Sequence, residues 1–265
     1  MTTGQLQRRL GLTSAVSITV GAVIGSGIFL KPLSVSQSLP SEGWIYLLWV
    51  GLGLVCLFGA FAYAELGAMF PEAGGQYAFL REGWGRFPAF LYGWTFFWVI
   101  NAGTIAALAI AFADYFLPLF GVDTGTESMR WIKLSVAGAM ILLLALVNHF
   151  GVALGALLQN VATFAKVGAL LLLVVGGTMV ITGSTGAAPP PPAANAATTL
   201  TVNGLVTAFL GIFWAYEGWY QLPFNAAELK RPERDLPRGL ILGMVVLILA
   251  YTAVNAMYQI GRAHV

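Results

Sequence analysis

Seven long apolar runs constrain this chain more than any other feature of its sequence. Each run approaches the roughly 20 apolar residues that a helix needs to cross a bilayer, and charged, glycine-rich or proline-rich segments separate the runs. Inside a bilayer every backbone polar group must be satisfied within the protein, which favours helix even where glycine and β-branched residues are common. We therefore predict an all-α integral membrane protein with spans near residues 12–30, 44–69, 87–117, 131–150, 162–181, 205–222 and 240–257.

Composition excludes an ordinary water-soluble domain. Hydrophobic residues make up 58% of the chain and charged residues 9%, whereas charged residues form roughly 25% of typical soluble chains. The net charge of +2 provides no basic footprint for a nucleic-acid partner. Cys56 is the one cysteine, and only His149 and His264 add imidazole. With no nucleophilic set, metal cluster or phosphate-binding loop in the sequence, we expect no enzyme activity, no metal and no cofactor.

The basic residues predict the orientation of the chain in the cytoplasmic membrane. If the N-terminus is cytoplasmic, eight basic residues lie on that side and three lie in the opposite loops. The excess favours a cytoplasmic N-terminus by the positive-inside rule. The inner set comprises Arg8, Arg9, Arg81, Arg86, Lys230, Arg231, Arg234 and Arg238, and the outer set comprises Lys31, Arg130 and Lys133.

The first apolar run contains a glycine-rich stretch that predicts an interrupted helix. Gly25, Ser26 and Gly27 stand directly before Ile28, and Gly21 lies four residues before Gly25. An unwound segment needs partners for its free N–H and C=O groups, and the N-terminus of the following half-helix favours an anion such as a carboxylate. Close helix packing is the competing interpretation, because small residues four apart also bring membrane helices together.

The sixth run carries a second disturbance, with Glu217 beside Gly218 in the middle of apolar residues. A carboxylate within a membrane span is costly unless it is paired, protonated or hydrated, which makes it a candidate for binding, gating or proton coupling. A structural hydrogen bond is the alternative for Glu217. Lys166 in the fifth run can likewise reach the interface with its long side chain. Two interrupted helices in corresponding positions are typical of transporters built from inverted repeats.

The order of these motifs resembles the amino acid–polyamine–organocation superfamily, specifically bacterial permeases similar to the L-type amino acid transporters. The matching stretches are GAVIGSGIF from Gly21, YAELG from Tyr63, FPEAGGQY from Phe70, Gln159 and Asn160 with Lys166, FWAYEGW from Phe213, ELKRP from Glu228 and LPR from Leu236. The resemblance implies the five-plus-five inverted-repeat (LeuT-like) fold. It also implies secondary active transport of amino acids by alternating access, through sodium-independent exchange or proton-coupled symport.

The resemblance also implies a substrate site. Backbone N–H groups and the hydroxyl around Gly25, Ser26 and Gly27, within the motif that includes Val23, Ile24 and Ile28, would hold the substrate carboxylate. Exposed carbonyls of Trp214, Ala215 and Glu217, beside Gly218, would receive the substrate ammonium. Trp214 would act as a gate over the substrate, and the ammonium of Lys166 would replace the sodium ion of sodium-coupled carriers. The expected partners are an amino acid, the lipid bilayer and, for symport, protons; no sequence feature indicates an oligomeric state.

Two departures from the family pattern bear on substrate choice and on length. Many relatives have other residues where Glu217 and Tyr220 stand, so the side-chain pocket can differ and favour polar or cationic substrates. We expect one transmembrane domain over residues 1–265, with a first repeat near 12–181 and the start of a second near 205–257. Because the second repeat stops after two helices and residues 260–265 do not match the family, we expect a truncated reading frame. A seven-helix receptor and a non-functional fragment are the alternatives.

Overall fold

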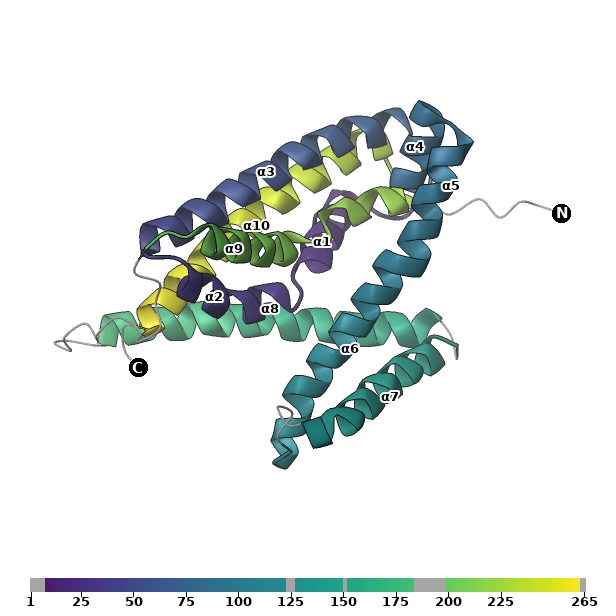
Figure 1. The fold of residues 1–265 in the computed structure, drawn as a ribbon. Coiled ribbons are helices and arrows are strands. Elements are labelled where there is room, and N and C mark those ends of the chain that lie inside the picture. The colour runs from purple at the N-terminus through teal and green to yellow at the C-terminus, as the bar shows by residue number, and fades with distance from the viewer. Residues whose placement is uncertain (1–7, 123–126, 150–151, 184–198, 263–265) are drawn as a thin grey trace. The chain divides into compact units, whose positions relative to one another are not determined.

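The structure is a computed structural model that describes residues 8–122, 127–149, 152–183 and 199–262. These residues form helices and connecting turns and contain no β-strand (Figure 1). The one β-type contact among them is an isolated bridge between Leu10 and Leu229. The described part of the chain is therefore all-α, as the apolar runs predicted.

Each of the seven predicted runs contains a helix, although the boundaries differ. The α-helices are α1 (Leu12–Val23), α2 (Gly27–Ser38), α3 (Glu42–Met69), α4 (Gln76–Trp84), α5 (Arg86–Thr95), α6 (Ala102–Phe116), α7 (Arg130–His149), α8 (Val152–Gly183), α9 (Val202–Tyr216) and α10 (Pro232–Arg262). A π-helical segment, η1 (Phe96–Asn101), joins α5 to α6. Three 3-10 segments, η2 (Leu117–Phe120), η3 (Glu127–Met129) and η4 (Trp219–Glu228), complete the order.

The first span is longer than predicted and does not end at residue 30. Helix α2 continues to Ser38, so Lys31 lies inside a helix and not in a loop as we expected. The apolar run ends near residue 30, but the hydroxyls of Ser34, Ser36 and Ser38 donate to carbonyls three residues earlier at 3.0, 2.8 and 2.8 Å. These side chains thereby satisfy their own polarity within the helix, which allows it to continue.

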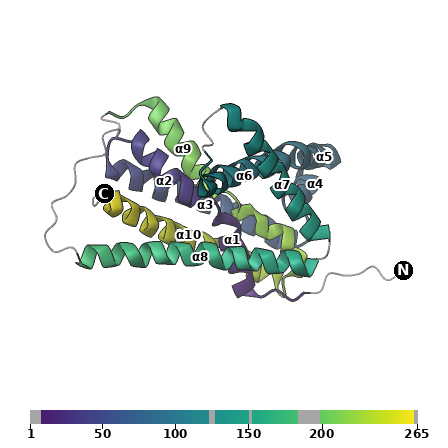
Figure 2. The same cartoon turned by 90° about the horizontal axis from the view of Figure 1, so that it is seen from below.

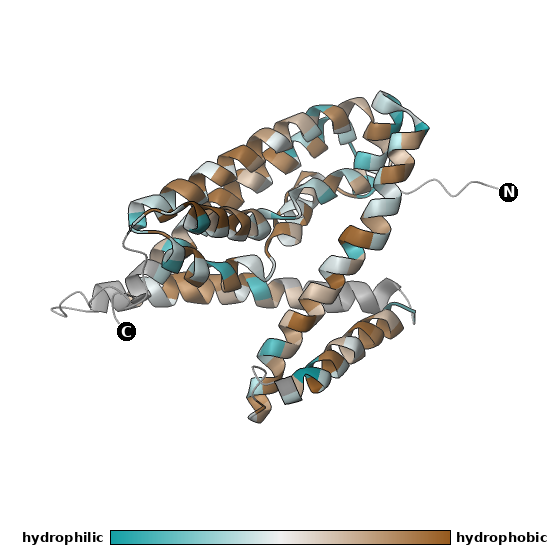
Figure 3. Cartoon of the chain, in the orientation of Figure 1, coloured by the Kyte–Doolittle hydropathy of each residue, from teal (hydrophilic) through white to brown (hydrophobic). Residues whose placement is uncertain are grey.

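Four helical segments are long and apolar enough to cross a membrane: Glu42–Met69, Arg86–Phe120, Arg130–His149 and Pro232–Tyr258. Helices α1 and α2 form a fifth candidate if the pair, bent by 48° at its break, counts as one span. Figure 3 shows predominantly hydrophobic residues along these segments. The described residues of α8 add a shorter apolar helix, Phe164–Met179, and α9 has 15 residues.

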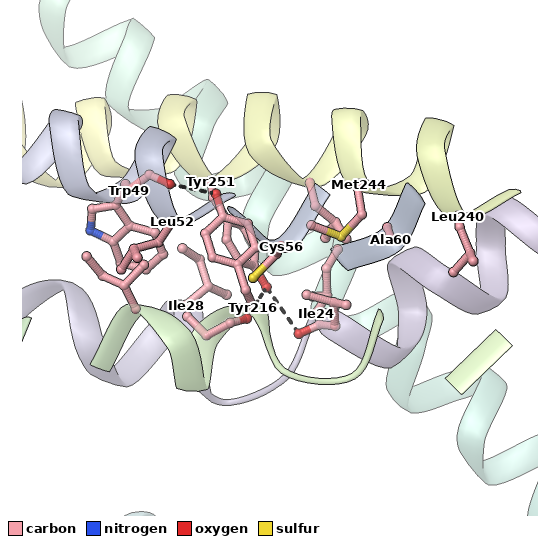
Figure 4. Packing of buried hydrophobic residues seen from close by; sticks show 14 of the residues in the cluster. Ile24, Ile28, Trp49, Leu52, Cys56, Ala60, Tyr216, Leu240, Met244 and Tyr251 are labelled. Atoms are coloured by element: carbon pink, nitrogen blue, oxygen red, sulfur yellow. Dashed lines mark hydrogen bonds between the residues drawn. The ribbon is translucent and has the colours of Figure 1, made fainter. Parts of the chain in front are cut away.

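The chain divides into two compact units, of which the first comprises Met1–Phe79 and Ala165–Val265. In this unit α3 and α10 run side by side (Figures 1 and 2). Helix α1 packs on α10, and α2 packs on α9. The core between these helices contains the fully buried aromatic side chains Trp49, Tyr216 and Tyr251 (Figure 4). This unit holds both helix breaks.

The second unit comprises Leu80–Phe164. Within it α6 packs against α7, and Lys133 of α7 forms an ion pair with Asp114 of α6. Its small core consists of Ala109, Ala113, Leu117 and Ala137. Most of its large apolar side chains are exposed, which is the arrangement expected of helices that face lipid.

Candidate functional site at the two helix breaks

The first break lies between Val23, the last residue of α1, and Gly27, the first residue of α2. The N–H of Ile24 closes α1 by donating to the Val20 carbonyl at 2.9 Å. Among the residues that the structure describes, the N–H groups of Gly25, Ser26 and Gly27 have no acceptor. The first N–H groups of a helix lack partners within that helix, and they carry the positive end of its dipole. The break therefore presents hydrogen-bond donors suited to an anion.

The predicted motif residues surround these donors. Val23, Ile24, Gly27 and Ile28 are buried, while Gly25 and Ser26 are partly exposed. The Ser26 carbonyl accepts the N–H groups of Phe29 at 3.1 Å and Leu30 at 2.9 Å. The first hydrogen bonds of α2 therefore start at the Ser26 carbonyl. The N–H of the same residue remains free to bind a ligand.

The second break follows Tyr216, the last residue of α9. Gly218 adopts φ +114°, a left-handed conformation that side chains other than hydrogen rarely tolerate, and η4 begins at Trp219. The prediction that the sixth span is interrupted at Glu217 and Gly218 is thus confirmed. Glu217 is exposed, and its Oε1 accepts a hydrogen bond from the Tyr220 hydroxyl.

The two breaks cross each other at very short range. A Cβ added to Gly27 would lie 2.5 Å from the Ala215 Cα, and one added to Gly218 would lie 2.6 Å from the Ala22 carbonyl oxygen. Residue numbers rise along one segment as they fall along the other, so the broken spans run antiparallel. The contacts of α2 with α9 and of α1 with η4 agree with this. Antiparallel broken helices are the arrangement that inverted repeats produce.

Lys166 of α8 reaches the first break. Its Nζ donates to the Ile24 carbonyl oxygen at 2.9 Å across 142 residues of sequence. This carbonyl belongs to the unwound segment and has no donor within α1. A charged ammonium therefore satisfies a backbone acceptor between α1 and α2, whereas a lysine extended toward the membrane surface would leave that acceptor without a partner.

The carbonyl groups near the second break already have donors from the chain. The Trp214 carbonyl accepts the Glu217 N–H at 3.3 Å, and the Ala215 carbonyl accepts the Tyr251 hydroxyl at 3.1 Å. Ala215 is 1% exposed, whereas the Trp214 side chain is 37% exposed. Two of the three carbonyls that the resemblance assigned to the ammonium are therefore engaged in this structure.

Sequence reasoning missed Tyr251, which the structure brings to both breaks. Its hydroxyl lies 3.1 Å from the Val23 carbonyl oxygen as well as 3.1 Å from that of Ala215. A tyrosine in the middle of the seventh apolar run was the available signal, because a buried tyrosine hydroxyl requires a hydrogen-bond partner. The described residues contain no group of three or more His, Cys, Asp or Glu side chains that could hold a metal ion.

Comparison with known proteins places these features in a family. Residues 10–263 match the family model described as amino acid permease. The chain is 34% identical to human b(0,+)-type amino acid transporter 1 over 256 residues, which is 97% of this chain and 52% of that protein. It is 32% identical to the human cystine/glutamate transporter over 254 residues, or 96% of this chain and 50% of that protein.

A third relative, the human large neutral amino acids transporter small subunit 2, is 32% identical over 255 residues, covering 96% of this chain and 47% of that protein. The chain thus spans about half the length of these relatives. All three are named as transporters and not as enzymes. Membership of a permease family is consistent with the long apolar helices, which indicate a multi-pass membrane protein. The chain belongs to the amino acid permease family.

Proposed function

We propose that this chain carries the substrate site of an amino acid transporter that works by alternating access, with the amino acid bound at the two helix breaks. The observation that carries the proposal is the set of free N–H groups at Gly25, Ser26 and Gly27, directly opposite the end of α9. A carboxylate fits these donors because a helix N-terminus favours anions. The relatives' names include cystine, glutamate and large neutral amino acids, which share an α-carboxylate and an α-ammonium group.

The substrate ammonium would lie near the end of α9, where Trp214, Ala215 and Glu217 contribute carbonyl groups. Trp214 is partly exposed there, in keeping with a side chain that closes over a bound amino acid. In the complete transporter, the helices that carry the breaks would move relative to the remaining helices around this site. Exchange and proton-coupled symport are both compatible with this arrangement.

The decisive test replaces one N–H donor without disturbing the helix. Ser26 has φ −64°, which proline also adopts, and its N–H has no acceptor among the described residues. Ser26→Pro should therefore keep the fold and abolish uptake of labelled amino acids into proteoliposomes. Ser26→Ala, which keeps the N–H and loses only the hydroxyl, is the matched control. Equal uptake by Ser26→Pro and the unmodified protein would contradict the carboxylate site.

This uptake assay is best run on the 265-residue chain and, beside it, on the product of the gene resequenced across codon 265. A panel of arginine, leucine, glutamate and cystine, with and without a pH gradient, separates exchange from proton symport. Absence of uptake by both forms across the panel would argue against transport and favour the receptor interpretation. Uptake by the 265-residue chain itself would exclude the alternative that it is a non-functional fragment.

The position of Lys166 supports the proposal that transport is independent of sodium. Its ammonium donates to the Ile24 carbonyl at 2.9 Å and supplies a fixed monovalent positive charge at the first break. A bound sodium ion would provide the same charge. Uptake should therefore be unchanged when choline replaces sodium in the medium, and a strict sodium requirement would contradict this role.

The carboxylate of Glu217 points to a cationic or polar substrate side chain. It is exposed at the end of α9 and hydrogen-bonded by Tyr220, so it can add a second charged contact beside the breaks. Glu217→Gln should reduce arginine uptake more than leucine uptake, because only the former gains from the charge. If both uptake and its pH dependence are unchanged, Glu217 has no part in substrate choice or proton coupling.

The chain should have its N-terminus in the cytoplasm. The basic residues near 8–9, 81–86 and 230–238 would then lie on the inner side. In a Cys56→Ala background, a cysteine introduced at Arg9 should react with a membrane-impermeant thiol reagent only after the membrane is opened. Labelling of intact cells at that position would reverse the orientation.

A further inference from the structure

Both helix breaks meet at a single side chain of α10. The Tyr251 hydroxyl lies 3.1 Å from the carbonyl oxygen of Val23 and 3.1 Å from that of Ala215. Val23 ends α1, and Ala215 is the residue before the end of α9. Tyr251 itself is fully buried in the core (Figure 4).

These two carbonyls need a donor from elsewhere in the protein. Within a continuous helix, each would accept the N–H four residues later, but those residues are Gly27, which begins α2, and Trp219, which begins η4. Val23 and Ala215 are 2% and 1% exposed, so water cannot readily serve them. Buried carbonyl groups in proteins are nearly always hydrogen-bonded, and the Tyr251 hydroxyl is a donor within reach of both oxygens.

The ring that carries this hydroxyl is held on several sides. It packs edge-to-face on Trp49, with ring centroids 5.8 Å apart, and lies 5.1 Å from the ring of Tyr216. The Tyr216 hydroxyl in turn donates to the Trp49 carbonyl at 3.1 Å. On α10, the Asn255 side chain donates to the Tyr251 carbonyl at 2.8 Å. The position of the Tyr251 hydroxyl is therefore determined by α3, α9 and α10 together.

A tyrosine hydroxyl has one proton to donate, so it can serve only one of the two carbonyls at a time. The other carbonyl is then open to a second donor. When movement of α9 exposes the Ala215 carbonyl to the substrate ammonium, the Tyr251 O–H can turn to Val23, and neither oxygen is then left without a donor. The two breaks would remain joined while one of them changes partner.

We infer that Tyr251 is a positioning residue that holds the two helix breaks in register and turns its O–H from the Ala215 carbonyl to the Val23 carbonyl when substrate binds. The substrate part of this inference rests on the proposed function. The structural part concerns only the coupling of α1 and α9 through α10.

The structural part is tested by hydrogen–deuterium exchange of the purified chain in nanodiscs. Tyr251→Phe removes one hydroxyl and should speed exchange about three- to tenfold at the hydrogen-bonded amides that border both breaks, in peptides covering 20–24 and 213–217, since a net hydrogen bond of this kind changes an equilibrium by about that factor. Tyr216→Phe is the matched control, because it removes an equally buried hydroxyl from the same cluster that bonds to α3. Faster exchange at one break only, or at neither, would overturn the inference.

A second variant has the opposite expected sign and does not depend on the fold of Tyr251→Phe. Replacing Tyr251 with 3-fluorotyrosine makes its hydroxyl a stronger donor, which should slow exchange at both breaks. The same replacement at Tyr216 should leave them unchanged. Unaltered exchange with fluorotyrosine at Tyr251 would contradict a hydrogen bond to either carbonyl.

The substrate part is tested by uptake kinetics. Tyr251→Phe should raise KM for amino acid uptake about three- to tenfold with little change in maximal rate, while Tyr216→Phe should leave KM as it is. Equal KM values for the two variants would refute the proposal that the Tyr251 O–H changes its hydrogen-bond partner when substrate binds. Absence of uptake by both unmodified forms would refute the proposed function instead, and the hydrogen–deuterium exchange data would still decide whether Tyr251 couples the breaks.

Discussion

At the scale of single residues, Gly27 is the position where the site tolerates least. A Cβ there would lie 2.5 Å from the Ala215 Cα and 3.0 Å from its backbone nitrogen, and backbone atoms cannot rotate away as a side chain can. Gly27→Ala should therefore destabilise the protein by roughly 1–3 kcal/mol, as overpacking typically does, and abolish substrate binding. Thermal unfolding in detergent provides the measurement.

Gly51 of α3 is a suitable control for this substitution, because a Cβ there meets nothing within 4 Å. Gly51→Ala should keep or slightly raise the unfolding temperature, since alanine is the better helix former by about 1 kcal/mol. If Gly27→Ala is as stable as Gly51→Ala, the two breaks are farther apart than the structure places them.

The hydrogen bond from Lys166 to the Ile24 carbonyl should contribute to both stability and substrate binding. Lys166→Met keeps the apolar stem but removes the donor to the Ile24 carbonyl. Leaving a buried acceptor without its partner costs about 1–3 kcal/mol, and Ile24 is 5% exposed. We expect a lower unfolding temperature and weaker amino acid binding, measured by scintillation proximity. Lys133→Met, which affects the ion pair with Asp114 in the other unit, should leave amino acid binding unchanged; loss of binding there would show that the assay reports general destabilisation.

At the scale of helices, the end of α9 depends on Gly218. Its φ is +114°, and a Cβ added there would lie 2.6 Å from the Ala22 carbonyl oxygen, so any substitution meets two separate costs. Gly121, at the end of η2, has φ +73° and no atom within 4 Å of an added Cβ, so it isolates the first cost. Gly218→Ala should lower the unfolding temperature clearly more than Gly121→Ala, whose strain costs about 1 kcal/mol. Equal losses would mean that backbone conformation alone fixes this helix end.

At the scale of the whole molecule, the exposed apolar faces should contact lipid. Trp98 is 59% exposed and Trp49 is 0% exposed. In variants that retain one tryptophan, brominated lipids should quench the fluorescence of Trp98 and leave that of Trp49 nearly unchanged, because bromine quenches at short range. Equal quenching would show that the core around Trp49 is open to lipid and would contradict the packing of α3, α9 and α10.

Much of the architecture was predictable because bilayer physics acts on local sequence. A run of about 20 apolar residues predicts a spanning helix without knowledge of its neighbours, and all seven runs contain helices. The stretch from Gly25 to Gly27 and the pair Glu217 and Gly218 correctly predicted both interruptions. Helix ends were less predictable: the serine hydroxyls that extend α2 to Ser38 bond to its own backbone, which composition does not reveal. The division into two repeats stays a prediction. The same holds for the statement that residues 260–265 do not match the family, and residues 263–265 lie outside the described part of the chain.

The sequence by itself determined the class of the protein, its helices and the two places where they break, because hydrophobicity and glycine content act within a short stretch of chain. Only the tertiary structure decided what each break meets. Ile24 accepts a hydrogen bond from Lys166, and the carbonyls of Val23 and Ala215 share the hydroxyl of Tyr251. These pairings join residues 36 to 228 positions apart, and they depend on how α1, α8, α9 and α10 pack, which no local pattern encodes.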